Sequence, residues 1–194
     1  MMQGKVLEIE GDLFDAPDGT ALIHACNCQG SWGGGIAKAF KDQYPAAFEK
    51  YRAHCRSFPS KPNQKTIRSY IGKTGESESS SKTVRLPEGT ALIIPPQESD
   101  YEGGSKKHWV VCLFTSRGYG RRVSPPETIL ENTKLAVADM KKQLAQLEAE
   151  EGGSSPSALW SCRFNSGLFA VDWELSREVL ENAELEVTVV RPSE

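Results

Sequence analysis

The chain has 194 residues, a length at which a single domain is expected. Its 23 lysine and arginine residues against 26 aspartate and glutamate residues give a formal net charge of −3, so it lacks the positive charge that a dedicated duplex nucleic-acid binder needs. Hydrophobic residues make up 38% and charged residues 25% of the sequence, which allows a substantial core and excludes a disordered chain.

The sequence carries no pattern of a secreted, membrane-spanning or zinc-stabilised protein. Its first residues lack the apolar segment of a secretory signal, and every apolar run is shorter than the roughly 18 residues of a membrane span. We therefore expect a cytoplasmic or nuclear protein with no membrane partner. The cysteines form no C-x-x-C pair, so neither structural zinc nor a disulfide framework is expected, and no metal or cofactor is predicted. These cysteines are Cys26, Cys28, Cys55, Cys112 and Cys162.

The first half of the chain alternates strand-like and helix-like patterns. Residues 6–10 and 21–26 predict strands, and the second segment is apolar on both faces, as in the covered centre of a sheet. Apolar spacing from Ile36 onward predicts a helix, and a second helix is expected over residues 47–55 after Pro45. Four further strands are predicted over residues 66–71, 84–86, 91–94 and 109–114.

The second half continues this alternation. Residues 126–148 carry apolar side chains at intervals of three and four, the pattern of a long helix packed on a sheet. Strands are predicted over residues 159–162 and 187–190, with a helix over 174–182. The order predicts a three-layer α/β fold, with a mixed central sheet of about six or seven strands and helices on both faces. Residues 1–194 then form one domain, with polar surface insertions at 73–83, 98–107 and 149–157.

A glycine-rich loop follows the predicted strand at residues 21–26. Asn27 begins this loop, and Gly33, Gly34 and Gly35 open the next helix. Glycines let the backbone approach a ligand closely, and free N–H groups at a helix start favour an anion such as phosphate. The spacing matches neither a dinucleotide fingerprint nor a P-loop, and an ordinary strand-to-helix connection is the alternative. Three consecutive glycines favour phosphate binding.

Two more segments follow predicted strands, at the sheet edge where α/β proteins bind ligands. Residues 165–173 contain a second glycine turn, which would face the first loop across the strand ends and suit a diphosphate. In this segment Phe169 is either a pocket residue or a core aromatic, and Asp172 fits an ordinary helix N-cap. Asp12 follows the first strand and is either a ligand-binding carboxylate or a turn residue.

His24 interrupts an otherwise apolar strand. A histidine near a phosphate pocket can move a proton at neutral pH, and a buried core histidine is the alternative. None of Cys26, Cys28 and Cys112 begins a C-x5-R phosphatase motif, and the sequence has no D-x-D-x-[TV] motif. Any hydrolysis is therefore expected to use water or substrate assistance, without a covalent protein intermediate.

Four segments carry a distinctive combination of residues. They are Gly11-Asp12-Leu13, Ile23-His24-Ala25-Cys26-Asn27-Cys28, Gly30-Ser31-Trp32-Gly33-Gly34-Gly35-Ile36-Ala37 and Ser166-Gly167-Leu168-Phe169. Together they resemble the macrodomain family, the ADP-ribose-binding module. Within that family, the block from His24 to Ala37 is similar to the fungal ADP-ribose 1''-phosphate phosphatase branch.

This resemblance implies a site for an ADP-ribose moiety. By analogy, Asp12 bonds the adenine amino group, Asn27 contacts the distal ribose and His24 lies near the terminal phosphate. Backbone groups of the two glycine loops would hold the phosphates. The implied substrate-binding residues are Gly11, Asp12, Leu13, Ala25, Cys26, Asn27, Trp32, Gly33, Gly34, Gly35, Ile36, Ala37, Asn165, Ser166, Gly167, Leu168, Phe169 and Ala170.

The activity implied is hydrolysis of the terminal phosphate of ADP-ribose 1''-phosphate, a by-product of tRNA splicing, to ADP-ribose and inorganic phosphate. In this hypothesis Asn27 orients the ribose and His24 is the candidate acid or base. A reader that binds ADP-ribose without chemistry and a hydrolase of ADP-ribosyl esters on proteins are the alternatives. The ester-cleaving branch uses a lysine and an aspartate where this sequence has Thr115-Ser116-Arg117 and Ser166-Gly167-Leu168-Phe169, so that alternative ranks third.

The expected partners follow from the same resemblance. They are a small-molecule substrate or an ADP-ribosylated protein, with no stable nucleic-acid partner, and the chain is expected to be a monomer. Arg117, Arg121 and Arg122 follow the predicted strand at 109–114, where they either guide an anionic substrate or form a solvated basic loop.

Overall fold

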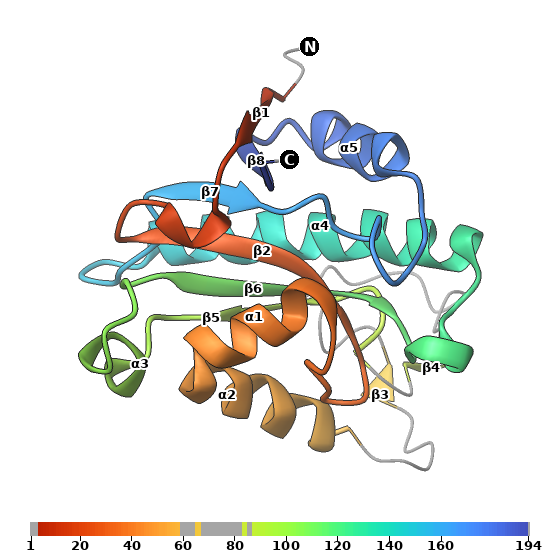
Figure 1. The fold of residues 1–194 in the computed structure, drawn as a ribbon, viewed down its shortest axis with the longest axis horizontal. Coiled ribbons are helices and arrows are strands. Elements are labelled where there is room, and N and C mark those ends of the chain that lie inside the picture. Colours follow the sequence, from red (N-terminus) through yellow and green to blue (C-terminus); the bar gives the residue numbers. More distant parts are fainter. Residues whose placement is uncertain (1–3, 59–64, 67–82, 85–86, 194) are drawn as a thin grey trace.

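A computed structural model describes residues 4–58, 65–66, 83–84 and 87–193 of the chain (Figure 1). Its centre is a six-stranded sheet in the order β1-β8-β7-β2-β6-β5. Neighbouring strands are parallel except β5, which runs antiparallel to β6, so the predicted mixed sheet is confirmed. The strands are β1 (Val6–Glu10), β2 (Thr20–Asn27), β5 (Ala91–Ile94), β6 (Trp109–Ser116), β7 (Ala158–Ser161) and β8 (Val187–Arg191).

Helices cover both faces of this sheet, which confirms the three-layer α/β prediction (Figure 1). One face carries α1 (Gly35–Gln43), α2 (Pro45–Arg56) and α3 (Glu98–Glu102), and the other carries α4 (Pro126–Ala149) and α5 (Trp173–Asn182). Successive residues of β2 point to opposite cores: Leu22 packs with Phe40 of α1, whereas Ile23 packs with Met140 of α4. The two-sided burial of β2 explains why its sequence is continuously apolar.

The expected strands at residues 66–71 and 84–86 fall partly outside the described residues. What the structure describes there is a short antiparallel pair, β3 (Lys65–Thr66) and β4 (Thr83–Val84), separate from the main sheet. The insertion predicted at 73–83 lies outside the described residues except for its last position. The segment at 149–157 is a largely exposed connection from α4 to β7. Among the described helices, none has the combination of length and apolarity required to cross a membrane.

The segment at 98–107 differs from the expected surface insertion because it contains α3 and a buried carboxylate. The Asp100 side chain is 5% exposed and accepts hydrogen bonds from the backbone N–H groups of Ala46 (2.8 Å) and Ala47 (3.0 Å). These N–H groups lie in the first turn of α2 and have no acceptor inside that helix. Asp100 therefore caps α2 from 54 residues away and ties α3 to the fold.

The sheet topology determines where a ligand site can form. The parallel strands β1, β8, β7, β2 and β6 end at one edge of the sheet. The segments that follow them are the Asp12 turn, the two glycine loops, the loop at Tyr119 and the chain after Arg191. In an open α/β sheet this is the edge at which ligands bind.

Candidate functional site

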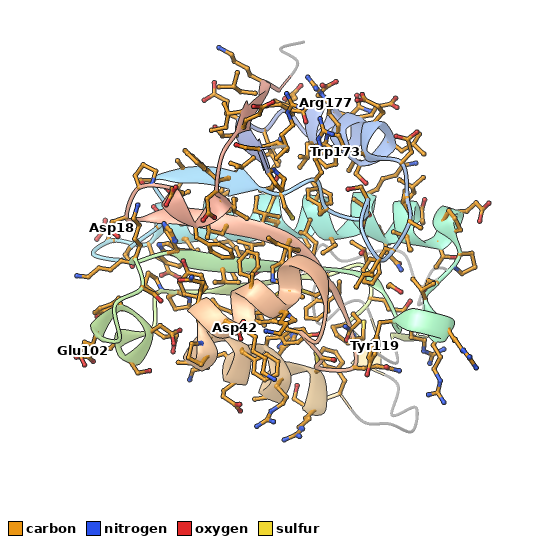
Figure 2. The ribbon with its side chains drawn as sticks, in the orientation of Figure 1. Asp18, Asp42, Glu102, Tyr119, Trp173 and Arg177 are labelled. Atoms are coloured by element: carbon orange, nitrogen blue, oxygen red, sulfur yellow. The ribbon has the colours of Figure 1, made fainter. Side chains whose placement is uncertain are left out.

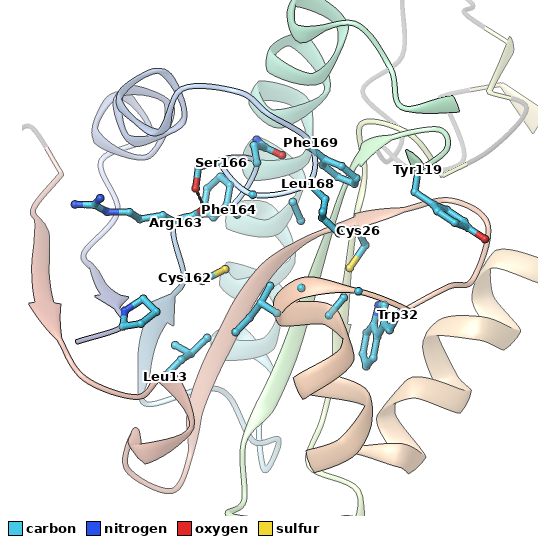
Figure 3. A pocket seen from close by; sticks show the side chains of 18 of the residues that line it. Leu13, Cys26, Trp32, Tyr119, Cys162, Arg163, Phe164, Ser166, Leu168 and Phe169 are labelled. Carbon is cyan, nitrogen blue, oxygen red and sulfur yellow. Dashed lines mark hydrogen bonds between the residues drawn. The ribbon is translucent and has the colours of Figure 1, made fainter. Parts of the chain in front are cut away.

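A large pocket opens at the carboxyl ends of the parallel strands. It has a volume of about 1270 Å³, and Figure 3 shows that it extends from Leu13 at one end to Tyr119 at the other. The pocket brings together every predicted substrate-binding residue except Ala170, and His24 is not in its wall. The wall also contains Ser31, Tyr119, Gly120, Cys162, Arg163, Phe164, Val190, Arg191, Pro192 and Ser193.

The first glycine loop presents unpaired backbone donors to this pocket. Gly34 is the N-cap of α1 and offers no side chain to cap it. Within the described part of the chain, the N–H groups of Gly35, Ile36 and Ala37 have no backbone acceptor, and the first helical bond comes from Lys38. Gly35 has φ +58°, a conformation that favours glycine. The positive end of the α1 dipole and these free donors make an anion site.

Asn27 organises the first loop through its side chain. Its Oδ1 accepts hydrogen bonds from the N–H groups of Gln29 (2.9 Å) and Ser31 (3.4 Å) and from the hydroxyl of Tyr51 (3.0 Å), and its Nδ2 donates to the Ser31 carbonyl (2.8 Å). The single proton of the Tyr51 hydroxyl is shared between this Oδ1 and the Asn27 carbonyl, which is nearer at 2.7 Å. The structure thus gives Asn27 a loop-positioning role at the pocket wall, and its contact with a ribose stays a prediction.

The second glycine loop is positioned by Asn165. This residue is buried, has φ +66°, and its carbonyl accepts the N–H of Val171 at 2.8 Å, which closes the loop. Its Oδ1 accepts from Thr115 of β6 (2.8 Å), and its Nδ2 donates to Thr133 of α4 (2.9 Å) and Ser176 of α5 (3.1 Å). One amide therefore connects the loop to three elements of the fold.

The two glycine loops meet across the pocket. Leu168 is 73% exposed. Gly34 has no Cβ atom, and one added there would lie only 3.1 Å from Cδ1 of Leu168. Phe169 is half-buried and lines the pocket, so its interpretation as a core aromatic is wrong. Asp172 accepts the N–H of Glu174 at 3.1 Å and is the N-cap of α5, which confirms the simpler interpretation of that residue.

Asp12 at the other end of the pocket is both a turn residue and a pocket residue. Its Oδ1 accepts the N–H of Phe14 at 2.9 Å and caps the short helix η1 (Leu13–Asp15). Its other carboxylate oxygen has no protein donor among the described residues and stays available to a ligand. Leu13 is buried beside it and contributes apolar surface to the same end of the pocket.

A buried histidine supports this end of the pocket from behind. The Nε2–H of His108 donates to the carbonyl of Ala16, just after η1, at 2.7 Å, and its Nδ1 accepts from the hydroxyl of Tyr44. This assignment of the ring protons follows from the carbonyl being an acceptor only. Burial lowers the pKa of His108 and outweighs the bond to Ala16, which raises it. The folded protein therefore holds His108 neutral near pH 7.

The neutral state of His108 predicts a pH dependence of stability. Between the lowered pKa of the folded state and about 6.5 in the unfolded chain, the unfolded chain binds more protons, so the free energy of unfolding falls as pH decreases through this range. We expect His108→Gln to lose part of this dependence in urea unfolding at pH values from about 7.5 to about 5. Burial also lowers the pKa of His54, so this residue contributes to the same pH dependence. Measuring His54→Gln in parallel separates its contribution from that of His108. An unchanged slope in His108→Gln would contradict the assignment.

His24 lies beneath the pocket and not in its wall. Its side chain is fully buried and stacks on Phe40, with ring centroids 4.0 Å apart and an interplanar angle of 6°. The Trp32 ring packs against it edge-on at 4.9 Å. Phe40 and Trp32 thus enclose the His24 ring in this structure, and the place of His24 near a terminal phosphate stays a prediction.

The pocket thiols are not nucleophiles at neutral pH. Burial raises the pKa of Cys26 well above its usual value and that of Cys162 to about 12. Both therefore stay protonated, in agreement with the predicted absence of a covalent cysteine intermediate. Among the described residues, His24, Cys26 and Cys112 form one group of possible metal ligands, with ligand atoms within 4.8 Å of one another. A metal there would have to displace the thiol protons.

Sequence reasoning missed the pocket residues that follow β7 and β8. Cys162, Arg163 and Phe164 come directly after β7, and Arg191 ends β8. The rule that ligands bind at the carboxyl ends of parallel strands could have found them, but it requires the strand directions. Tyr119 is an exposed aromatic residue, and the neighbouring Arg121 and Arg122 are exposed as well. Neither arginine is in the pocket wall, which favours a solvated basic loop.

An ion-pair group joins the second loop to β1. Glu8 accepts hydrogen bonds from Arg163 (2.9 Å), Arg177 (2.6 Å) and the indole of Trp173 (3.2 Å). Figure 2 shows Trp173 and Arg177 together on α5. Burial raises the pKa of Glu8, but the bonds and charges of Arg163 and Arg177 outweigh it and lower the pKa overall. Arg163 is thus held at the pocket wall by a charged partner.

Comparisons with known proteins agree with this architecture. The Macro domain family model matches residues 23–180. The chain is 63% identical over 194 residues to an ADP-ribose 1''-phosphate phosphatase of Aspergillus clavatus, covering 100% of this chain and 97% of that protein. It is 43% identical over 182 residues to the Chaetomium globosum protein of the same name, covering 93% and 85% of the two chains.

Solved structures share the fold at low identity. The macrodomain of Mycobacterium tuberculosis DarG has a TM-score of 0.64 at 19% identity and covers 98% of this chain and 99% of that one. Thermosipho africanus DarTG in complex with ADP-ribose has a TM-score of 0.60 at 17% identity, covering 99% of this chain and 43% of that one. The chain belongs to the macrodomain family, as the family model and the fungal relatives show, and it has a pocket at the strand ends.

Proposed function

We propose that this protein hydrolyses ADP-ribose 1''-phosphate to ADP-ribose and inorganic phosphate. The observation that carries the proposal is the pair of opposed glycine loops in a pocket large enough for a dinucleotide. Relatives 63% identical over essentially the whole chain carry the name of this phosphatase, which supports the same activity here. The pocket supplies the recognition that this substrate requires.

The proposed substrate lies along the pocket from Asp12 to Tyr119. The free oxygen of Asp12 accepts the adenine amino group, and Leu13 contacts the base. The diphosphate lies between the N-terminus of α1 and the loop at residues 166–169, where backbone donors face it from both sides. The distal ribose then points toward Phe169 and Tyr119. Backbone donors bind phosphate without lysines, so the net negative charge of the chain does not oppose binding.

The chemical step is a transfer of the terminal phosphoryl group to water. The water oxygen bonds to phosphorus, the bond between phosphorus and the ribose oxygen breaks, and the water protons end on ADP-ribose and phosphate. The pocket wall holds thiols that stay protonated, and its carboxylate, Asp12, lies at the adenine end. We propose that catalysis comes from positioning and from backbone N–H groups that stabilise charge on the phosphoryl group. In this proposal the substrate itself assists the proton transfer.

Phosphate release from ADP-ribose 1''-phosphate by the purified protein tests this function. We expect release from this substrate and none from p-nitrophenyl phosphate, which lacks the adenosine and diphosphate groups that the pocket binds. Asp12→Ala is expected to raise KM by about tenfold with little change in kcat, because it removes a contact made equally in the ground and transition states. Absence of release from the wild type, with ADP-ribose still bound in calorimetry, would overturn the phosphatase proposal.

A reader of ADP-ribose is the second candidate. The observation that favours it is the enclosure of His24, which leaves the described pocket wall near the glycine loops without an imidazole. Binding with no turnover is the result that selects this function. An ADP-ribosyl ester hydrolase gains no support, because the chain has Thr115-Ser116-Arg117 and Ser166-Gly167-Leu168-Phe169 where the ester-cleaving branch uses a lysine and an aspartate.

A further inference from the structure

Trp32 is enclosed by aromatic rings on its inner side. Its side chain is 1% exposed, and its ring stacks on Tyr51 with centroids 4.8 Å apart and an interplanar angle of 17°. Phe48 lies at 5.4 Å, Phe40 at 6.0 Å and His24 at 4.9 Å. These neighbours account for the position of the ring, and none of them accepts a hydrogen bond from it.

The indole N–H of Trp32 has no acceptor. Within the part of the chain that the structure describes, three buried side-chain polar atoms lack a partner: Thr20 Oγ1, Trp32 Nε1 and Ser161 Oγ. Of these three residues, Trp32 alone lines the pocket. Most buried N–H groups are paired in folded proteins, so an unpaired one at a binding site indicates a partner that arrives with the ligand.

The surroundings of the indole identify the part of the ligand that it meets. Aromatic rings pack against the indole, and the residues that follow it, Gly33 to Gly35, line the pocket without side chains. Figure 3 shows Trp32 and Tyr119 at the same end of the pocket and Leu13 at the other. The base would lie at Leu13, so Trp32 is near the distal end of a bound ADP-ribosyl group.

We propose that the indole N–H of Trp32 donates a hydrogen bond to an oxygen of the terminal phosphate on the distal ribose. This inference rests on the proposed function. An indole only donates, and phosphate oxygens only accept when ionised, so the pair is complementary and charge-assisted. Trp32 thereby distinguishes the phosphorylated substrate from ADP-ribose, and it orients the terminal phosphoryl group while the free N–H groups of α1 hold the diphosphate.

The direct test follows the indole N–H signals of the protein by two-dimensional proton–nitrogen NMR. The chain has four tryptophans, and Trp32→Phe identifies the signal of Trp32. If that variant does not fold, replacing Trp109, Trp160 and Trp173 one at a time identifies it by elimination. We expect ADP-ribose 1''-phosphate to move the Trp32 signal downfield and to slow its hydrogen exchange, and ADP-ribose to do neither. An equal response to both ligands, or to neither, overturns the inference.

Kinetics give a second, independent test. Trp32→Phe keeps an aromatic ring and removes the donor, so kcat/KM for ADP-ribose 1''-phosphate is expected to fall roughly tenfold to hundredfold. Its Kd for ADP-ribose stays within about twofold of the wild type, because that ligand lacks the acceptor. Trp109→Phe is the matched control: Trp109 pairs with Ala21 at the opposite end of the sheet, and this variant is expected to keep its activity.

The outcomes separate this inference from the proposed function. Wild-type turnover with unchanged kcat/KM in Trp32→Phe overturns the role of Trp32 and leaves the phosphatase standing. A wild type without turnover overturns the phosphatase, and the NMR comparison of the two ligands still decides whether Trp32 reads the terminal phosphate.

Discussion

Replacing Gly34 by glutamate is expected to abolish ADP-ribose binding while the protein still folds. Gly34 has φ −150° and ψ 164°, an extended conformation that any residue adopts. A Cβ atom there would meet Leu168 Cδ1 at 3.1 Å, and Leu168 is exposed enough to move away. The new carboxylate would therefore enter the gap between the two loops, where the diphosphate is proposed to lie.

The expected magnitude follows from bulk and like charge together. A carboxylate that faces a diphosphate weakens the binding free energy by several kcal/mol, which corresponds to a loss of affinity of more than about a hundredfold. Calorimetry with ADP-ribose measures the affinity, and urea unfolding should show a stability change of less than about 1 kcal/mol. Gly153→Glu adds the same charge in the exposed α4–β7 connection and is expected to bind normally. Near-normal affinity in Gly34→Glu would show that the ligand does not pass between the loops.

The second large effect is expected at Asn165. In Asn165→Ala the buried hydroxyls of Thr115, Thr133 and Ser176 each lose a partner, and alanine must adopt φ +66°. Thr133 keeps its bond to the Ile129 carbonyl, so the hydroxyls of Thr115 and Ser176 carry the main loss. We expect the free energy of unfolding to fall by about 3 kcal/mol or more, since unpaired buried groups cost about 1–3 kcal/mol each and the backbone strain about 1 kcal/mol. Urea unfolding measures this loss. Binding of ADP-ribose should weaken as well, because the second loop loses its anchor.

Two further variants divide this effect into its causes. Asn165→Gly removes the same side chain but tolerates the positive φ, so its difference from Asn165→Ala reports the backbone strain. Ser176→Ala removes one of the three bonds, and a loss of about 1 kcal/mol is expected. Asn182→Ala, at the exposed end of α5, is the control and should be neutral. A neutral Asn165→Ala would mean that the loop is held by its backbone alone.

Periodicity and glycine placement are local properties, and they predicted the fold and the location of the site. The alternation of residues 187–190 and the three-and-four spacing of residues 126–148 produced β8 and α4 as expected. The glycine run after β2 correctly indicated a helix start with free N–H groups at the pocket. The Asp12 turn and the 165–169 loop were also placed correctly, because each comes within a few residues of the end of a strand.

The roles of individual side chains depended on partners that are distant in sequence. Tyr51, 24 residues from Asn27, makes that amide a positioning group. Asp100 turns an expected surface insertion into a helix that caps α2. Neither relation has a sequence pattern, because the contacts arise from the packing of separate elements.

The surroundings of His24 depend on both the sequence and the tertiary structure. The chain by itself determined that His24 lies on a central strand two residues before Cys26, and that a glycine loop follows. Only the tertiary structure decided that Phe40 and Trp32 enclose the His24 ring while Cys26 reaches the pocket. Strand periodicity places both side chains on one face of the sheet, but what covers that face depends on how α1 and its preceding loop pack against it.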